Sequence, residues 1–209
     1  MKKILFLLSF VLIFPILAWG QDKIEAPVWK AGDKWVLTSV ETANCEVEVV
    51  DADESSYTVK FSRCMFDLTP SQIVFEKSTL NRIYTLEGKK RRKYDWARRR
   101  LFNFPLFEGK QWGEDKSSGL PLYNPDAPQI EFLYAETYQV TGWEDVEVPA
   151  GKFRAIKIKY MQRNITGLSG GNAYFWYVPE VKYFVKYQID KNTWKTGYDM
   201  ELISFGLKE

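Results

Sequence analysis

The chain has 209 residues, with 29 Lys and Arg against 27 Asp and Glu, 16% aromatic residues and no histidine. This length is sufficient for one domain with a substantial core. The lack of histidine excludes catalytic sites built on Ser-His-Asp or Cys-His groups, the HExxH zinc site and pH switching by histidine.

The N-terminus has the layout of a cleaved secretory signal peptide. Two lysines precede an apolar stretch, residues 4–19, and small residues occupy the −3 and −1 positions of a cut before Gln21. An uncleaved anchor is the less favoured alternative, because the stretch contains a proline and is shorter than the roughly 20 residues of a spanning helix. We therefore expect residues 1–20 to be removed. Residues 21–209 should form a single β-rich domain, periplasmic or secreted, with no further membrane segment and, since no cysteine follows the cut, no lipid anchor.

Charge is unevenly placed along the expected mature chain. The signal segment contains two lysines and no acid, so residues 21–209 carry 27 basic and 27 acidic residues. The run KKRRKYDWARRR, residues 89–100, holds eight basic residues and one acid and carries +7. The rest of the mature chain must carry about −7, so the protein is expected to be dipolar rather than globally basic.

Alternation of apolar and polar residues predicts β-strands through most of the mature chain. In 155–161, for example, Ile156 and Ile158 alternate with Lys157 and Lys159. Such one-sided strands are typical of antiparallel sheets, so we expect an all-β antiparallel fold, as a curled sheet, a half-barrel or a β-sandwich. The other predicted strands lie near 35–42, 45–51, 57–66, 72–76, 80–87, 98–104, 132–140, 146–148, 173–178, 183–189 and 194–205.

Two hairpins can be predicted in more detail. Residues Pro149 to Gly151 separate two alternating segments and suit a three-residue turn with a bulge. A second hairpin is expected around residues 51–56. If residues of equal parity pair there, the apolar faces coincide and one register sets Glu48 opposite Lys60.

The two cysteines leave two possibilities open. Exported proteins often pair their cysteines, which favours a Cys45–Cys64 disulfide. However, the two positions differ in parity, so the register that aligns the apolar faces points them to opposite sides of the sheet. A bulge near Arg63 would bring them together; otherwise both thiols are free. Their separation does not match a Cys-x-x-Cys metal site.

Two short segments resemble each other. AGDKW at 31–35 and EGKQW at 108–112 each place glycine three residues before tryptophan. This similarity indicates either a duplicated β-meander, covering about 27–103 and 104–209, or chance. Residues 115–128 are rich in proline and glycine and are expected to form a long surface loop.

From Phe104 onward, the segments FPLFEGKQW, YQVTGWEDVEVPAGKFRAIKIKY, FWYVPEVKYFVKYQ and ELISF resemble a known group. They are similar to the exported bacterial proteins of the domain-of-unknown-function 3108-like family, over roughly half of the mature chain. The resemblance implies a β-rich envelope or secreted domain and brings no activity and no catalytic residues. Glu180 and Lys182 follow Pro179 where such proteins often have glycine, which puts the local turn in doubt.

The basic run is the main candidate for a binding site. One interpretation is a solvated hairpin, with a tip at 89–93 and arginines lying over aromatic rings. The other is a surface for an anionic lipid, lipopolysaccharide or acidic polysaccharide, where each cation contributes about 1 kcal/mol. Nucleic acid is not expected as a partner of an exported protein. The candidate anion-binding residues are Lys89, Lys90, Arg91, Arg92, Lys93, Arg98, Arg99 and Arg100.

Two acidic segments and one set of aromatic residues each have a functional and a structural interpretation. The acidic segments DADE (51–54) and EDVE (144–147) could serve a glycosidase or a calcium site, but acids are ordinary at predicted turns. Tyr174, Trp176 and Tyr183 could line a cavity for an apolar ligand, or they could simply pack a core.

The sequence therefore predicts an exported, non-enzymatic envelope protein without cofactor or metal. Its expected partner is an anionic lipid or polysaccharide bound by the basic run. The first alternative is a carrier of a small apolar ligand or lipid inside a curled sheet. A carboxylate-dependent hydrolase is the less favoured second alternative.

Overall fold

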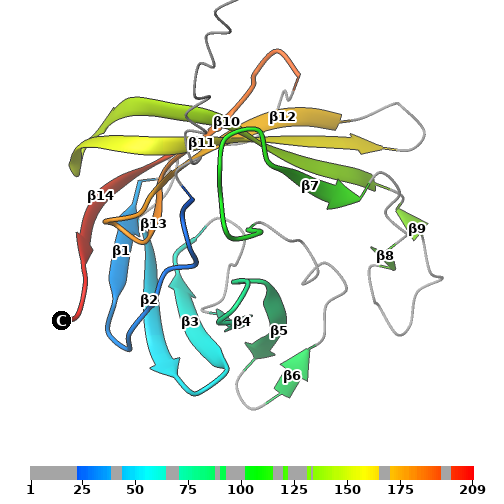
Figure 1. The fold of residues 1–209 in the computed structure, drawn as a ribbon. Coiled ribbons are helices and arrows are strands. Elements are labelled where there is room, and N and C mark those ends of the chain that lie inside the picture. Colours follow the sequence, from blue (N-terminus) through cyan, green and yellow to red (C-terminus); the bar gives the residue numbers. More distant parts are fainter. Residues whose placement is uncertain are drawn as a thin grey trace, which may run out of the picture.

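The computed structural model describes residues 23–38, 44–64, 71–87, 90–92, 102–114, 120–121, 131–132, 134–164, 170–193 and 199–209. All regular structure within these ranges is β, as the alternation predicted (Figure 1). The strands are β1 (Lys34–Leu37), β2 (Cys45–Ala52), β3 (Ser56–Ser62), β4 (Ser71–Glu76), β5 (Arg82–Glu87), β6 (Lys90–Arg92), β7 (Gln111–Glu114), β8 (Leu120–Pro121), β9 (Glu131–Phe132), β10 (Tyr134–Val148), β11 (Gly151–Asn164), β12 (Gly170–Val178), β13 (Tyr183–Ile189) and β14 (Met200–Gly206).

Twelve of these strands form one antiparallel sheet that curls without closing. Its order is β6-β5-β4-β3-β2-β1-β14-β13-β12-β11-β10-β7, and β8 pairs separately with β9. In Figure 1, β7 and β10 to β12 form a layer across the top, β1 to β5 lie below it, and β13 and β14 lead from one group to the other. The expectation of an all-β antiparallel curled sheet is confirmed.

The sheet consists of two consecutive meanders with the same strand order, β1 to β6 and then β7 with β10 to β14. Each begins with the same backbone geometry. Gly32 and Gly109 have φ angles of 92° and 83°, and their N–H groups donate to the carbonyls of Val49 and Val140 at 2.7 and 3.0 Å. The carbonyl of the residue after each glycine accepts a bond from the same valine at 2.9 Å, and the register shifts just beyond each valine.

Both predicted hairpins are present. Between β2 and β3 the pairing sets Glu48 opposite Lys60, as expected from parity. Between β10 and β11 the last pair is Val148 with Gly151, so the connection is residues 149–150 and not the three residues predicted. Gly151 has a φ of 137°, which glycine adopts without strain, and it keeps its place in the ladder at that angle.

The two cysteines form a disulfide, with their Cα atoms 4.4 Å apart. Regular pairing of β3 with β2 ends at Ser62, opposite Glu46. The next residue, Arg63, has a φ of 61°, in the left-handed region. This change in chain direction brings Cys64 to the face of the sheet that carries Cys45. The predicted irregularity near Arg63 is therefore what resolves the conflict in parity.

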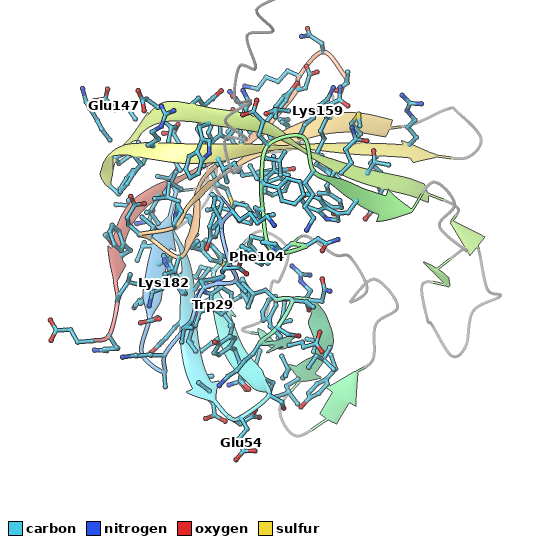
Figure 2. All side chains as sticks on the ribbon, viewed as in Figure 1. Trp29, Glu54, Phe104, Glu147, Lys159 and Lys182 are labelled. Atoms are coloured by element: carbon cyan, nitrogen blue, oxygen red, sulfur yellow. A yellow bond between two sulfur atoms is a disulfide. The ribbon has the colours of Figure 1, made fainter. Side chains whose placement is uncertain are left out.

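Trp35 in β1 and Trp29 just before it donate hydrogen bonds to a turn of the second meander. Trp35 is fully buried, its ring stacks on Tyr183 with centroids 4.8 Å apart, and its Nε1 donates to the Val181 carbonyl at 2.8 Å. Trp29 donates to the next carbonyl, that of Lys182, at 2.9 Å; Figure 2 shows these two residues next to each other. Burial raises the pKa of Tyr183 to about 12.

The turn between β12 and β13 keeps its shape without glycine. Lys182 has a φ of 59°, and its N–H donates to the Pro179 carbonyl at 3.1 Å. Its ammonium also donates to the Val28 carbonyl at 2.8 Å. These bonds hold a lysine in a conformation that glycine usually occupies, so the departure from the family pattern leaves a closed turn.

A second aromatic cluster fills the space beside β12 and β13. Phe102 stacks on Phe184 with ring centroids 4.7 Å apart and on Phe104 with centroids 5.3 Å apart. Phe102 and Phe104 each meet the ring of Tyr177 edge to face. Burial raises the pKa of Tyr177.

A strand over 98–104 was predicted; residues 98–101 lie outside the described residues, and 102–104 belong to no strand. The alternation there was wrongly interpreted, because these rings pack into the core from a loop.

Candidate functional site

The basic run reaches the open end of the curled sheet. Lys90–Arg92 form β6, which pairs with β5 through Leu86 and Arg91 (Figure 1). The prediction of a hairpin tip over 89–93 is therefore wrong for these three residues, because backbone pairing with β5 makes them a strand despite their lack of alternation. The other five candidate residues, Lys89, Lys93, Arg98, Arg99 and Arg100, lie outside the described residues.

The DADE segment ends β2 and opens the turn to β3, and the Asp53 carboxylate in this turn accepts hydrogen bonds from neighbouring residues. Asp53 Oδ1 accepts from the N–H groups of Ser55 and Ser56 at 2.8 and 2.6 Å, and Oδ2 accepts from the Ser56 hydroxyl at 2.7 Å. Figure 2 shows Glu54 at the far end of the β2–β3 hairpin. The hydrogen bonds from Ser56 and Ser55 lower the pKa of Asp53 to about 2.

We expect Asp53 to titrate near pH 2 in the folded protein, against an ordinary value of 3.8. Because the folded pKa is the lower one, the stabilisation by this carboxylate is complete above the unfolded pKa and is lost as pH falls through the folded pKa. NMR titration of the Asp53 carboxyl carbon measures the value. A Ser56→Ala control should raise it, and a wild-type value at or above 3.8 would contradict the assignment.

The EDVE segment supplies ion pairs across the β10–β11 hairpin. Each of its three acids lies beside a cation of the facing strand: Glu144 with Lys157 at 3.2 Å, Asp145 with Arg154 at 3.4 Å and Glu147 with Lys152 at 3.3 Å.

Within the described ranges, no group of three or more acids and cysteines is placed to hold a metal ion. The same ranges contain no helix long and apolar enough to cross a membrane.

The three aromatic residues proposed to line a common cavity are separated. Tyr174 and Trp176 are neighbours, with ring centroids 6.1 Å apart, whereas Tyr183 is stacked on Trp35. Tyr174 borders a surface hollow of about 440 Å³ that includes neither Trp176 nor Tyr183. Of the two possibilities for these residues, a cavity lining or a packed core, the structure favours packing for Tyr183, because it starts the strand after the turn, where the first meander covers it.

Strands β11 to β13 carry two adjacent cross-strand rows on the side we call the lysine face. In the first row Lys157, Trp176 and Lys186 face one another in register. Their ammonium groups lie 4.8 and 5.7 Å from the indole ring, and Glu144 and Glu201 pair with the two lysines at 3.2 and 2.8 Å. The indole N–H donates to Glu144. Both lysines of this row thus have a carboxylate partner within the protein, so we interpret the row as stabilising the sheet and not as binding a ligand.

The second row, which we call the polar row, consists of Gln139, Lys159, Tyr174 and Gln188 on β10, β11, β12 and β13. Figure 2 shows Lys159 on the side of the β10–β12 layer that faces away from β1 to β5. Lys159 has no ion-pair partner among the described residues. Alternation in 155–161 indicated the polar side of β11, but only the register between strands brings these four residues together.

Comparisons with known proteins give weak likenesses. No protein-family profile and no curated protein matches the chain. A proposed exported protein with YmcC-like fold from Bacteroides fragilis is 15% identical, covers 88% of this chain and 100% of its own, and has a TM-score of 0.44. A proposed lipoprotein from Parabacteroides distasonis is 14% identical over 89% and 100%, with a TM-score of 0.39. The hypothetical lipoprotein YmcC from Escherichia coli is 11% identical over 82% and 83%, with a TM-score of 0.42.

Likenesses at this level assign neither a family nor an activity. The resemblance to the domain-of-unknown-function 3108-like family therefore stays a prediction. Evidence for a function has to come from the surface of the chain itself.

Proposed function

We propose that the chain is an exported, non-enzymatic protein of the bacterial envelope that binds an anionic surface through residues 89–100. The observation that carries this proposal is the position of β6. It is the last strand at the open end of the sheet, and among the described residues it pairs only with β5. Three of the eight basic residues thus lie along a sheet edge. The signal-like N-terminus supports export.

Electrostatics explains why such a segment would bind. The run carries +7 within twelve residues, while the remainder of the mature chain is acidic, so an anionic surface attracts this end of the molecule and repels the others. Each cation near an anionic membrane contributes about 1 kcal/mol, and screening by salt weakens the attraction. An acidic polysaccharide offers the same charge without the bilayer.

The test compares residues 21–209 with a variant in which the eight basic residues of 89–100 become Gln. Binding to phosphatidylglycerol liposomes and to heparin is measured across a salt series, and the two arms distinguish a lipid headgroup from a polysaccharide. We expect the wild type to bind one of them at low salt, with affinity falling as salt rises. The variant should bind at least tenfold more weakly, since about 1 kcal/mol per cation is removed eight times.

A matched control removes the same charge elsewhere. It replaces eight basic residues outside the run with Gln, seven of them exposed and Lys60 half-buried: Lys23, Lys30, Lys60, Arg63, Lys152, Arg154, Arg163 and Lys208. If both variants lose binding equally, net charge and not the run is responsible. No binding by the wild type at low salt would also overturn the proposal.

A further inference from the structure

We propose that the polar row and its hollow form a second binding site, for a saccharide that carries a carboxylate. The site goes beyond the proposed function, because it lies on β10 to β13 and involves none of the residues of 89–100. It combines three features that suit such a ligand: an aromatic ring, side-chain amides and a lysine that has no ion-pair partner among the described residues.

The four side chains of the polar row share one face of the sheet. Gln139 pairs with Lys159, Lys159 with Tyr174, and Tyr174 with Gln188, and residues directly opposite in an antiparallel pair point to the same side. With strands about 4.8 Å apart, the row extends over about 14 Å. This length suits a short chain of sugar rings rather than a single small ion.

Lys159 differs from the two lysines of the neighbouring row. Lys157 and Lys186 each have a carboxylate partner, at 3.2 and 2.8 Å, and both lie over Trp176. Lys159 is half-buried beside Tyr174 and has no such partner within the described residues. A carboxylate of a ligand would supply the counter-charge that the protein provides for the other two.

The ring of Tyr174 is held in place. The Lys157 ammonium lies 4.9 Å from its centre, and the Trp176 ring lies beside it. Tyr174 also borders the hollow. The C–H groups on the flat side of a pyranose carry slight positive charge, and the face of an aromatic ring is negative, so the two surfaces attract each other.

The hollow is an open surface depression with polar groups in its wall, which suits a ligand that stays in contact with solvent. Asp190 in its wall is fixed by bonds from Asn192 and Asn172, and the hydrogen bond from the Asn192 backbone lowers the pKa of Asp190. Hydroxyl groups of a sugar can bond to such fixed polar groups, whereas an acyl chain cannot. The lining residues are Tyr174, Gln188, Ile189, Asp190, Lys191 and Asn192.

The experiment titrates residues 21–209 with tri-galacturonate and, separately, with the neutral trisaccharide maltotriose. The side-chain amide signals of Gln139 and Gln188 are followed by NMR. We expect tri-galacturonate to shift both signals and to bind more tightly than maltotriose. Tyr174→Ala should weaken binding about fivefold. Lys159→Gln should weaken it about threefold and remove the preference for the acidic sugar.

Three controls make the result specific. Tyr174→Phe keeps the ring and should keep binding. Lys152→Gln makes the same charge change at the tip of the β10–β11 hairpin and should have no effect. The variant with eight Gln in 89–100 should still bind tri-galacturonate, so failure of the proposed function and failure of this site are distinguishable.

The proposal is overturned if tri-galacturonate leaves both amide signals unmoved, if Tyr174→Ala binds as the wild type does, or if the variant of 89–100 loses the sugar. Tyr174 is only partly buried, so Tyr174→Ala should fold. An unchanged spectrum away from the site verifies this, and Lys159→Gln provides a second variant that leaves the aromatic packing intact.

Discussion

Replacing Trp35 with alanine is expected to lower the free energy of unfolding by about 3–5 kcal/mol, the range for a large aromatic residue removed from a core. The side chain is fully buried. The substitution removes its stacking on Tyr183 at 4.8 Å and leaves the Val181 carbonyl without the donor that now lies 2.8 Å away. Urea denaturation followed by circular dichroism measures the change.

Two comparisons define the mechanism. Trp35→Phe keeps most of the apolar contact and loses the N–H, so its loss should be intermediate, with about 1–3 kcal/mol arising from the unpaired carbonyl. Val28→Ala, at a position that is 66% exposed, should change the stability by less than about 0.5 kcal/mol. If Trp35→Ala cost less than about 1 kcal/mol, the bonds between the two meanders would not hold the fold together.

The double substitution of Cys45 and Cys64 by alanine is expected to cost about 3 kcal/mol, because the disulfide closes a loop with a sequence separation of 19 residues. Intact mass after alkylation of the denatured protein should first show no labelled thiol in the wild type. Denaturant unfolding then compares the wild type with the variant.

Reduction provides the matched control. A reducing agent should lower the stability of the wild type by a similar amount and leave the double variant unchanged. Equal stability of the two proteins under oxidising conditions would contradict the role assigned to the disulfide, and two alkylated thiols in the wild type would contradict the disulfide itself.

The effect expected for Trp35 concerns contacts between parts that are distant in sequence. Trp35 lies in the first meander and Trp29 just before it, and their acceptors, Val181 and Lys182, belong to the second meander. The two meanders also share one continuous sheet through β1 and β14. We therefore expect them to unfold together.

Local sequence determined the strand character of this protein and much of its pairing. Alternation predicts an all-β chain because side chains of a strand point to opposite sides with a period of two. Parity limited the β2–β3 pairing to registers that include the observed one, with Glu48 opposite Lys60, since a shift of one residue would turn the apolar side of β3 to solvent. Proline and glycine marked the β10–β11 turn because their backbone preferences are local.

Tertiary structure decided what depends on single backbone angles and on register across several strands. Whether Cys45 meets Cys64 depended on the backbone angle of one residue, Arg63. The polar row exists only because four strands align Gln139 with Gln188. No local pattern encodes such an alignment, because hydrogen bonds along a ladder are nearly equivalent and the packing of buried rings selects among registers. The sequence alone therefore identified the basic run as a candidate site, and the pairing of strands was needed to find the polar row.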